Sequence, residues 1–447
     1  MALAPPRPNG HAAFMTDIAP SDAPTDVAGL PARAAALDLL TAALGGRAGM
    51  DEGLSHPALA ALSARDRAFA RALVMATLRH LGPIDAALQA RVKKAPPDKV
   101  VQILRLGVAQ AFLLNTPAHA AVATSVDLVA RDKGLAMFKG LVNAVLRGLL
   151  REPPELADPD LLAPGWLQAR WRAAFGVEEA CKVAAMIAEE PATDLSVKDA
   201  NAALAIAAGL EAMVLPGGTL RTSRRGDLAT WPGFTEGGWW VQDASAAIPA
   251  RLLAVQPGET ALDMCAAPGG KTLQLAAAGA TVIALDRAPA RLKRVTENLA
   301  RTGLTAATVA ADAANWKDGR SFDAVLLDAP CSATGTFRRH PDVLWAAKPS
   351  DIAGLAAVQS KLLDAAVRRL KPGGRLVYCV CSLEPEEGEG QVAAFLSRTP
   401  DVALDPISES EGGSPPASLR ADGTLRILPH HAPGGTDGFY VARFRKA

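Results

Sequence analysis

Residues 322–331 read FDAVLLDAPC, an apolar run that ends in a carboxylate, a proline and a thiol. The run Phe322–Leu327 has the length and composition of a buried β-strand, and Pro330 closes it. A second run of this kind, Arg375–Val380, follows a Lys-Pro-Gly-Gly turn and leads directly into Cys381. In open parallel α/β sheets, ligands bind outside the carboxyl ends of the strands. Two thiols and a carboxylate at one such edge could perform covalent chemistry.

Strand-like segments alternate with helix-like segments around these two runs. The expected strands are Thr260–Asp263, Thr281–Leu285, Thr308–Ala311, Phe322–Leu327 and Arg375–Val380, and the expected helices are Leu273–Ala278, Ala288–Arg301 and Ile352–Leu370. This alternation predicts a parallel sheet with right-handed crossovers, and therefore a Rossmann-like α/β domain over residues 251–447. The segment Gly438–Phe444 is predicted to add a last strand at an edge of the sheet.

A chain of 447 residues is too long for one ordinary core, so two or three domains are expected. Residues 1–27 are rich in Pro, Ala and Asp and predict a disordered tail. Residues 28–151 contain one amphipathic segment after another and predict an all-α bundle. Residues 152–192 predict a helical connector. Residues 193–250 mix turns with short apolar runs and predict a small α+β subdomain.

The net charge of +1 conceals an uneven distribution. Residues 28–151 carry 16 Lys and Arg against 8 Asp and Glu, whereas residues 152–447 carry 30 against 35. A basic helical domain joined to a mildly acidic one favours a polyanionic partner such as a nucleic acid, although a solvated helical surface is the alternative. Its basic residues include Arg79 and Arg105, and Arg221, Arg224 and Arg225 form a further cluster that could contact RNA or belong to a solvated loop.

The chain contains five cysteines, an odd number, and none of them forms a C-x-x-C pair. This usage favours reduced thiols in the cytoplasm over a disulfide framework, and it argues against a zinc site, so no metal is expected. The uncharged window Leu106–Val126 contains Gln110, Asn115 and His119, which argues against a transmembrane span.

The segment Asp263–Thr272 reads DMCAAPGGKT and lies between the first expected strand and its helix. Its adjacent glycines allow a tight turn and a close approach of the backbone to a ligand. The spacing matches neither the dinucleotide fingerprint nor the P-loop. Asp286 and Asp312 follow the next two strands, where carboxylates can bind ribose hydroxyls and an adenine amino group. Each Asp alone is more often a helix cap, but the series favours a nucleoside cofactor without phosphates, S-adenosylmethionine.

The segment Asp328–Cys331 separates two kinds of methyl transfer. Methyltransferases that act on the amino groups of bases usually carry Asn/Asp-Pro-Pro-aromatic here, whereas this chain has a cysteine in place of the aromatic residue. A cysteine suits a carbon acceptor, because C5 of a pyrimidine becomes nucleophilic only after a group such as a thiolate adds to C6. The base must also be unstacked or already single-stranded.

Two parts of the chain resemble known families. The segments Asp66–Arg71, Leu104–Gln110 and Val142–Arg147 resemble the NusB-like RNA-binding domain, in which a helical bundle binds RNA and protein partners. Residues 193–447 resemble the RNA 5-methylcytosine methyltransferases of the NOL/NOP/Sun type, through the segments Asp263–Thr272, Asp328–Gly335, Cys379–Glu387 and Thr436–Phe439. The combination is similar to the RsmB/Sun (Fmu) family of small-subunit (16S) ribosomal RNA cytosine-C5 methyltransferases, which implies a class I methyltransferase domain behind a NusB-like bundle.

The resemblance also implies roles for individual residues. Cys381 matches the nucleophile that attacks C6, Cys331 matches the second cysteine that helps to release the product, and Asp328 matches the acid that supports the cytosine ring. The matching cofactor contacts are Cys265, Ala266, Ala267, Pro268, Gly269, Gly270, Lys271, Asp286, Asp312 and Asp328. The chain departs from the family pattern at Val380, where Thr is usual, and at Gly388, where Asn is frequent. Cys265 and Cys379 are expected to be packing residues.

Two other functions remain open from the residues alone. A methyltransferase with the same chemistry could act on transfer RNA. The chain could also be a NusB-like protein that binds RNA or a transcription complex and whose methyltransferase half is only a scaffold. Asp286, Asp312, Asp328 and both cysteines of the expected site are present, which favours the enzyme.

Overall fold

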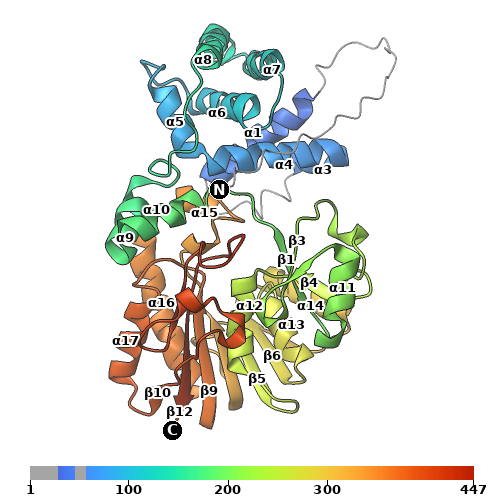
Figure 1. The fold of residues 1–447 in the computed structure, drawn as a ribbon, viewed down its shortest axis with the longest axis vertical. Helices are drawn as coiled ribbons and strands as arrows, with labels where there is room; N and C mark the ends of the chain where they lie inside the picture. The colour runs from blue at the N-terminus through green and yellow to red at the C-terminus, as the bar shows by residue number, and fades with distance from the viewer. Residues whose placement is uncertain (1–28, 46–56) are drawn as a thin grey trace, which may run out of the picture.

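The computed structural model describes residues 29–45 and 57–447, so the expected disordered tail at residues 1–27 lies outside the described residues. The N-terminal part is helical, as expected, and lies above the rest of the molecule in Figure 1. Its helices are α1 (Leu30–Gly45), α3 (Pro57–Ala60), α4 (Ala64–Arg79), α5 (Leu81–Gln89), α6 (Asp98–Phe112), α7 (Ala118–Arg131) and α8 (Lys139–Arg151). Apolar stripes of these helices form one buried core, in which α6 supplies Ile103, Leu104 and Val108.

Two helices and a small sheet connect this bundle to the larger sheet. The helices are α9 (Gly165–Phe175) and α10 (Val177–Ala185). The small sheet is antiparallel, has the order β2-β3-β1-β4 and carries helix α11 (Ala203–Leu210). Its strands are β1 (Thr193–Val197), β2 (Met213–Val214), β3 (Leu220–Thr222) and β4 (Trp239–Val241).

The large sheet has the order β10-β12-β9-β8-β5-β6-β7, with β11 paired to β12. Its strands are β5 (Thr260–Met264), β6 (Thr281–Asp286), β7 (Ala307–Ala310), β8 (Phe322–Asp328), β9 (Leu370–Val380), β10 (Val402–Leu404), β11 (Leu425–Ile427) and β12 (Phe439–Lys446). The strands from β5 to β9 pair in parallel, which confirms the Rossmann-like α/β prediction. Its helices are α12 (Ala244–Leu253), α13 (Gly270–Ala277), α14 (Pro289–Thr302), α15 (Asp342–Ala346), α16 (Pro349–Arg368) and α17 (Glu389–Arg398).

Helices cover both faces of this sheet, which explains why its strands are almost continuously apolar. On β9, Leu376, Tyr378 and Val380 pack in the same core as Leu362 and Leu363 of α16. The alternate residues Val377 and Cys379 pack in another core, with residues of α12 and α13. Figure 1 shows α16 and α17 beside one part of the sheet, and α12, α13 and α14 beside the other.

The prediction that the last strand lies at the edge of the sheet was wrong. Strand β12 pairs antiparallel with β9 on one side and with β10 and β11 on the other. The physical reason is burial on both faces: Tyr440, Val441 and Ala442 are consecutive in the strand and all fully buried. The described residues contain no helix that is both long and apolar enough to cross a membrane.

Arg79 lies at the joint between the helical bundle and the rest of the chain, and is not free to bind RNA. Its guanidinium donates to the carbonyls of Ile187 and Glu189, at 3.1 and 3.0 Å, and to that of Arg338, at 2.5 Å. Burial lowers its pKa to about 10. Trp345 donates to the carbonyl of Leu78 beside it. The end of α4 is therefore bonded to the segment that precedes α15.

Two more of the basic residues singled out from the sequence are held in ion pairs. Arg105 pairs with Asp85 on α5 at 2.6 Å. Arg221 is buried and forms a two-pronged pair with Asp194, with both distances 2.7 Å, while its remaining nitrogen donates to the carbonyl of Pro433. Arg221 therefore holds the small sheet together, and Arg225 of the same cluster pairs with Glu190 and donates to the carbonyl of Pro191.

Candidate active site

The two cysteines and the carboxylate expected at one edge of the sheet do lie together. Strands β8 and β9 are parallel neighbours, and Asp328 is in register with Cys379. The segments that follow the two strands therefore begin side by side. The Sγ atoms of Cys331 and Cys381 lie 3.5 Å apart, although 50 residues separate them in the sequence.

Asp328 is bound to a lysine from the Gly-rich turn. Lys271 Nζ lies 2.7 Å from Asp328 Oδ2, and the lysine side chain is only 9% exposed. Burial acts to lower the pKa of Lys271, but the negative charge of Asp328 outweighs it and holds the pKa above the usual range. Lys271 is thus a buried ammonium, and it also lies over the ring of Phe439. Cys379 Sγ contacts the other Asp328 oxygen at 3.5 Å.

Three thiols near this edge stay protonated at neutral pH. The hydrogen bond with Cys381 and, second, burial raise the pKa of Cys331 well above its usual value. Burial and then the charge of Asp328 raise the pKa of Cys379. Burial raises the pKa of Cys265 to about 12. Cys379 is protonated and fully buried, as expected of a packing residue, whereas Cys265 is partly exposed.

A cavity of about 720 Å³ lies at this edge, and Cys331 and Cys381 both line it. It has room for a nucleoside-sized ligand and a flipped base together. The residues of the expected site that line it are Cys265, Ala266, Ala267, Pro268, Gly270, Lys271, Asp328, Cys331 and Cys381. Three expected cofactor contacts, Gly269, Asp286 and Asp312, do not belong to the lining.

Each of these three residues makes contacts with other parts of the protein. Asp286, at the end of β6, is 3% exposed and accepts hydrogen bonds from the backbone N–H groups of Ala267 and Ala288. Asp312 is exposed in the turn after β7 and accepts from Asn315. Asp286 therefore holds the Gly-rich turn from behind, whereas Asp312 stabilises its own turn.

Both glycines lie in close contact with neighbouring residues, and Gly269 also has a backbone conformation that favours glycine. Gly269 has a φ of +109°, and a Cβ there would lie 3.2 Å from Val295 of α14. A Cβ on Gly270 would lie 3.3 Å from the side chain of Gln242. The turn can therefore pass between α14 and the segment before α12, and start α13 beside the cavity.

Arg339 forms another part of the wall, which the sequence interpretation missed. It lines the cavity and forms a salt bridge with the buried Asp437. Asp243 lies behind this pair and accepts from the backbone N–H of Asp437 and the hydroxyl of Thr436. The segment Thr436–Phe439 resembles the family, and that resemblance was the available signal for this cluster.

Asp263 is a buried carboxyl at the start of the Gly-rich turn. Its Oδ2 accepts from the hydroxyl of Thr272 at 2.6 Å, while its Oδ1 has no hydrogen-bond partner within the described structure. Burial raises its pKa to about 7. A neutral carboxyl is therefore favoured at this position in the folded protein below neutral pH.

Asp263→Asn should gain stability relative to the parent protein as the pH rises from about 5 to about 8. The pKa of Asp263 is raised in the folded protein, so the neutral carboxyl stabilises the fold at low pH. This stabilisation is lost as the pH rises past the folded-state pKa, because the carboxyl then ionises inside the protein, whereas the amide of Asn stays neutral. We expect the difference in Tm to change by a few degrees, since 1 kcal/mol shifts the Tm of a domain of this size by about 2–4 °C. Thermal unfolding across this pH range measures it.

Asp323→Asn is the matched control for this prediction. Lys371 and Thr260 hold the pKa of Asp323 below its usual range, so this carboxylate is ionised at both ends of the pH interval. Its Tm difference from the parent protein should not change between about pH 5 and pH 8. A flat profile for Asp263→Asn as well would contradict the raised pKa.

A cluster with metal-ligand chemistry lies elsewhere in the described part of the chain. Glu179, His430 and His431 offer ligand atoms within 4.8 Å of one another. None of the three lines the cavity. His430 and Glu179 are joined by a hydrogen bond of 2.7 Å, which ties α10 to the segment before β12.

Comparisons with known proteins give the same architecture. The family model described as 16S rRNA methyltransferase RsmB/F matches residues 250–445, and that of the NusB family matches residues 30–151. The ribosomal RNA small subunit methyltransferase B of Pseudomonas syringae pv. tomato is 38% identical over 438 residues, which cover 93% of this chain and 96% of that protein. The protein of the same name from Pseudomonas putida is 39% identical over 444 residues, covering 93% and 98%.

Solved structures are similar to this chain in fold. The crystal structure of PH0851 has a TM-score of 0.77 at 24% identity, over 94% of this chain and all of that one. A methyltransferase homologue from Pyrococcus horikoshii has a TM-score of 0.55 at 27% identity, over 65% of this chain and 98% of that one. The resemblance inferred from the sequence is thereby confirmed. The chain belongs to the ribosomal RNA small subunit methyltransferase B family.

Proposed function

We propose that this protein methylates C5 of a specific cytosine in small-subunit (16S) ribosomal RNA, through a covalent bond between Cys381 and C6 of the base. The observation that carries the proposal is the approach of two thiols to 3.5 Å, at the cavity that also contains Asp328 and Lys271. Methyl transfer to an amino nitrogen requires no thiol. Transfer to C5 requires a nucleophile at C6, and a cysteine can supply it.

The residues around the Gly-rich turn fit S-adenosylmethionine, the methyl donor of this class of methyltransferases. Burial and, after it, the carboxylates of Asp328 and Asp286 raise the pKa of Cys265, so two carboxylates lie close to the Gly-rich turn. Carboxylates at this position can interact favourably with the sulfonium and ammonium groups of the cofactor. When bound, the cofactor supplies an electrophilic methyl group.

We assign the cofactor contacts as the resemblance implies. The turn from Cys265 to Lys271 would hold the cofactor against the sheet, Asp286 would accept from the ribose hydroxyls, and Asp312 would accept from the adenine amino group. The last two carboxylates would have to be reached at the rim of the cavity, since neither lines it. Asp328 lies between the cofactor edge and the cysteines, so it can contact both ligands.

The proposed reaction proceeds in three steps on the cytosine ring. The Cys381 thiolate adds to C6, which makes C5 nucleophilic. C5 then takes the methyl group, and Asp328, with its Lys271 partner, supports the charge and the amino group of the ring. A base removes the C5 proton, the C5–C6 double bond re-forms, and the C6–S bond breaks to return the thiolate. The products are 5-methylcytosine, the demethylated cofactor and one proton.

The protonation pattern supports this division of roles between the two cysteines. The raised pKa of Cys331 leaves a proton on its sulfur, so its S–H can point at Cys381 Sγ. Arg339 places a positive charge on the cavity wall, where it interacts electrostatically with Cys381. We therefore keep the roles that the family resemblance implies, with Cys381 as the nucleophile and Cys331 as the neighbour that acts when the adduct breaks down.

The other predictions about the molecule become part of the same proposal. The bundle over residues 28–151 would hold ribosomal RNA, while residues 152–192 connect it to the small subdomain at 193–250 and the catalytic domain at 251–447. The target cytosine would be single-stranded or flipped, because a stacked base could not reach both sulfur atoms. The five free thiols suit the reducing cytoplasm.

The test is transfer of labelled methyl groups to unmodified RNA. Incubation with methyl-labelled cofactor and unmodified small-subunit RNA should place the label on one cytosine, which bisulfite mapping would name. RNA binding without transfer would contradict the proposal and favour a scaffold. Equal or faster transfer to transfer RNA would favour the transfer RNA alternative.

A further inference from the structure

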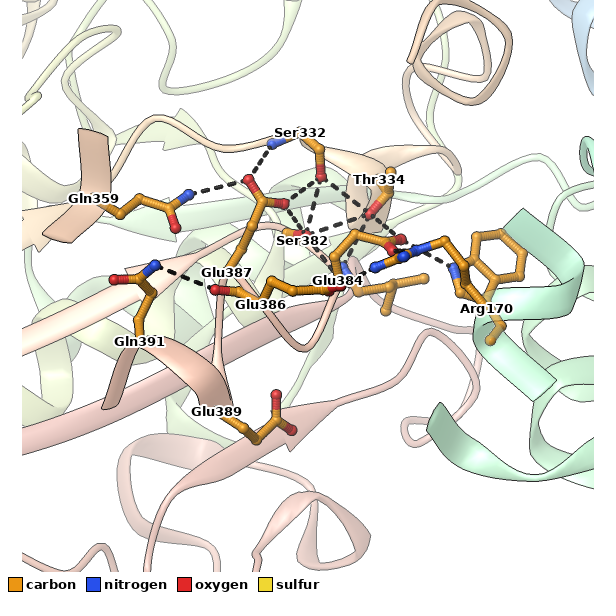
Figure 2. Close-up of polar contacts among 12 residues, drawn as sticks. Arg170, Ser332, Thr334, Gln359, Ser382, Glu384, Glu386, Glu387, Glu389 and Gln391 are labelled. Carbon is orange, nitrogen blue, oxygen red and sulfur yellow. Dashed lines mark hydrogen bonds and ion pairs between the residues drawn. The ribbon is translucent and has the colours of Figure 1, made fainter. Parts of the chain in front are cut away.

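Glu387 is a fully buried carboxylate that binds both cysteine-bearing loops. Its Oε1 accepts from the backbone N–H of Ser332 at 2.9 Å and from the side-chain amide of Gln359 at 3.0 Å. Its Oε2 accepts from the hydroxyls of Ser332 and Ser382, both at 2.5 Å. Figure 2 shows the carboxylate at the centre of these contacts.

The two serines are the residues that directly follow the two cysteines. Ser332 follows Cys331 in the loop after β8, and Ser382 follows Cys381 in the loop after β9. Their hydroxyls also approach each other to 3.1 Å. Gln359, on α16, donates in addition to the carbonyl of Pro330, the residue before Cys331. One carboxylate therefore fixes both loops at the positions next to the sulfur atoms.

The burial of the Glu387 carboxylate has an unfavourable free energy for a purely structural contact. All four donors to the Glu387 side chain are neutral groups, which only partly offset the free-energy cost of removing a carboxylate from water. Apolar packing could join the same two loops at lower cost. A functional requirement for a particular distance between the two cysteines would explain why a carboxylate is buried here.

A second group of contacts holds the far part of the same loop. Glu384 is fully buried, pairs with Arg170 of α9 at 2.5 Å and is contacted by Thr334 and Trp171 at 3.4 Å each. Its backbone N–H donates to Ser382 Oγ. Figure 2 shows Arg170 reaching this loop from the connector. The loop that begins at Cys381 is thus held both at its start and in its middle.

We propose that Glu387 is a positioning residue that sets the distance between the Cys331 and Cys381 sulfur atoms. The proposal rests on the proposed function for its catalytic consequence, but the distance itself can be measured without any methylation. With the carboxylate removed, the two loops lose their shared acceptor and the sulfur atoms separate. Glu387 does not touch the substrate, so its effect is on the rate of the chemical steps and not on binding.

The distance is tested by crosslinking the two thiols with a bifunctional bimane reagent. The full-length protein is treated, and the Cys331–Cys381 product is identified by mass spectrometry of its peptides. The parent protein should give this product, and Glu387→Ala should give severalfold less of it. Glu386→Ala is the matched control: Glu386 is the adjacent glutamate, is 51% exposed and pairs with Arg170, so its removal should leave the yield unchanged.

Glu387→Gln separates position from charge and guards against a folding defect. The amide oxygen can accept from the two N–H donors, and the amide nitrogen can donate to the two serine hydroxyls, which rotate freely. The crosslinking yield should therefore return to near the parent value. Where RNA methylation is measured, Glu387→Ala should lose about 100-fold in kcat with little change in either KM, since a misplacement of about 1 Å costs about that much. Glu387→Gln should recover most of the loss.

An undiminished crosslinking yield in Glu387→Ala, with the fold intact by circular dichroism, would overturn the positioning role. So would a yield in Glu387→Gln as low as in Glu387→Ala, because position and not charge is proposed to matter. A parent protein that crosslinks but transfers no methyl group would defeat the proposed function alone, and the crosslinking yields would still decide the role of Glu387.

Discussion

Cys381→Ser should abolish methylation, with a loss of roughly 10⁴-fold or more, because removal of a catalytic nucleophile costs at least that much in enzymes with covalent intermediates. A serine hydroxyl remains protonated at neutral pH and cannot add to C6 at a useful rate. Serine is close in size to cysteine, so the loop and the cavity should keep their shape. Methyl transfer from labelled cofactor to unmodified small-subunit RNA measures the loss.

Cys181→Ser is the control for this substitution. Cys181 is a free, partly exposed thiol on α10 and belongs neither to the cavity lining nor to the sulfur pair. It should retain parent activity, and both variants should bind RNA and cofactor as the parent does. Appreciable methylation by Cys381→Ser would show that Cys381 is not the nucleophile.

Cys331→Ser should accumulate a covalent protein–RNA adduct that survives denaturant. With Cys381 intact, addition to C6 and methyl transfer to C5 still occur. The step that suffers is the breakdown of the adduct, because the variant lacks the second sulfur, which lies 3.5 Å from the sulfur of Cys381 in the parent protein. We expect most of the enzyme to be trapped in the first turnover, visible as a shifted band on a denaturing gel after incubation with cofactor and RNA.

The double variant Cys331→Ser with Cys381→Ser serves as the control for trapping. It should form no adduct, since the trapped bond is made by Cys381. An adduct in Cys381→Ser, and none in Cys331→Ser, would mean that the two roles are reversed. Turnover by Cys331→Ser at the parent rate would leave that residue with no part in product release.

Local patterns predicted most of the fold, because the large sheet is built from consecutive buried strands and helices. The order of the strands in the sheet was harder to predict, as the misplaced β12 shows. Its position next to the chain end suggested an edge, but the four apolar residues Phe439–Ala442 have the composition of a strand covered on both faces.

The proximity of Cys331, Cys381 and Asp328 could be predicted because each lies in a short motif at a strand end. Their surroundings could not, because they depend on contacts between distant segments. Glu386 and Glu387 are identical neighbours in the sequence, yet the first is half exposed and the second is fully buried between two loops. Likewise, charge counting could not reveal that Arg79 and Arg221 are buried and form hydrogen bonds and ion pairs within the protein, and so do not belong to an RNA-binding surface.

The central claim is that the acceptor is C5 of cytosine, and release of tritium from that carbon tests it most directly. Small-subunit RNA is prepared with [5-³H]cytidine and incubated with the protein and S-adenosylmethionine that carries a ¹⁴C-labelled methyl group. The proposed reaction removes the C5 hydrogen for each methyl group added, so tritium should appear in water in equal amount to ¹⁴C in RNA, after correction for specific activity. Incorporation of ¹⁴C without release of tritium would place the methyl group on another atom and contradict the account.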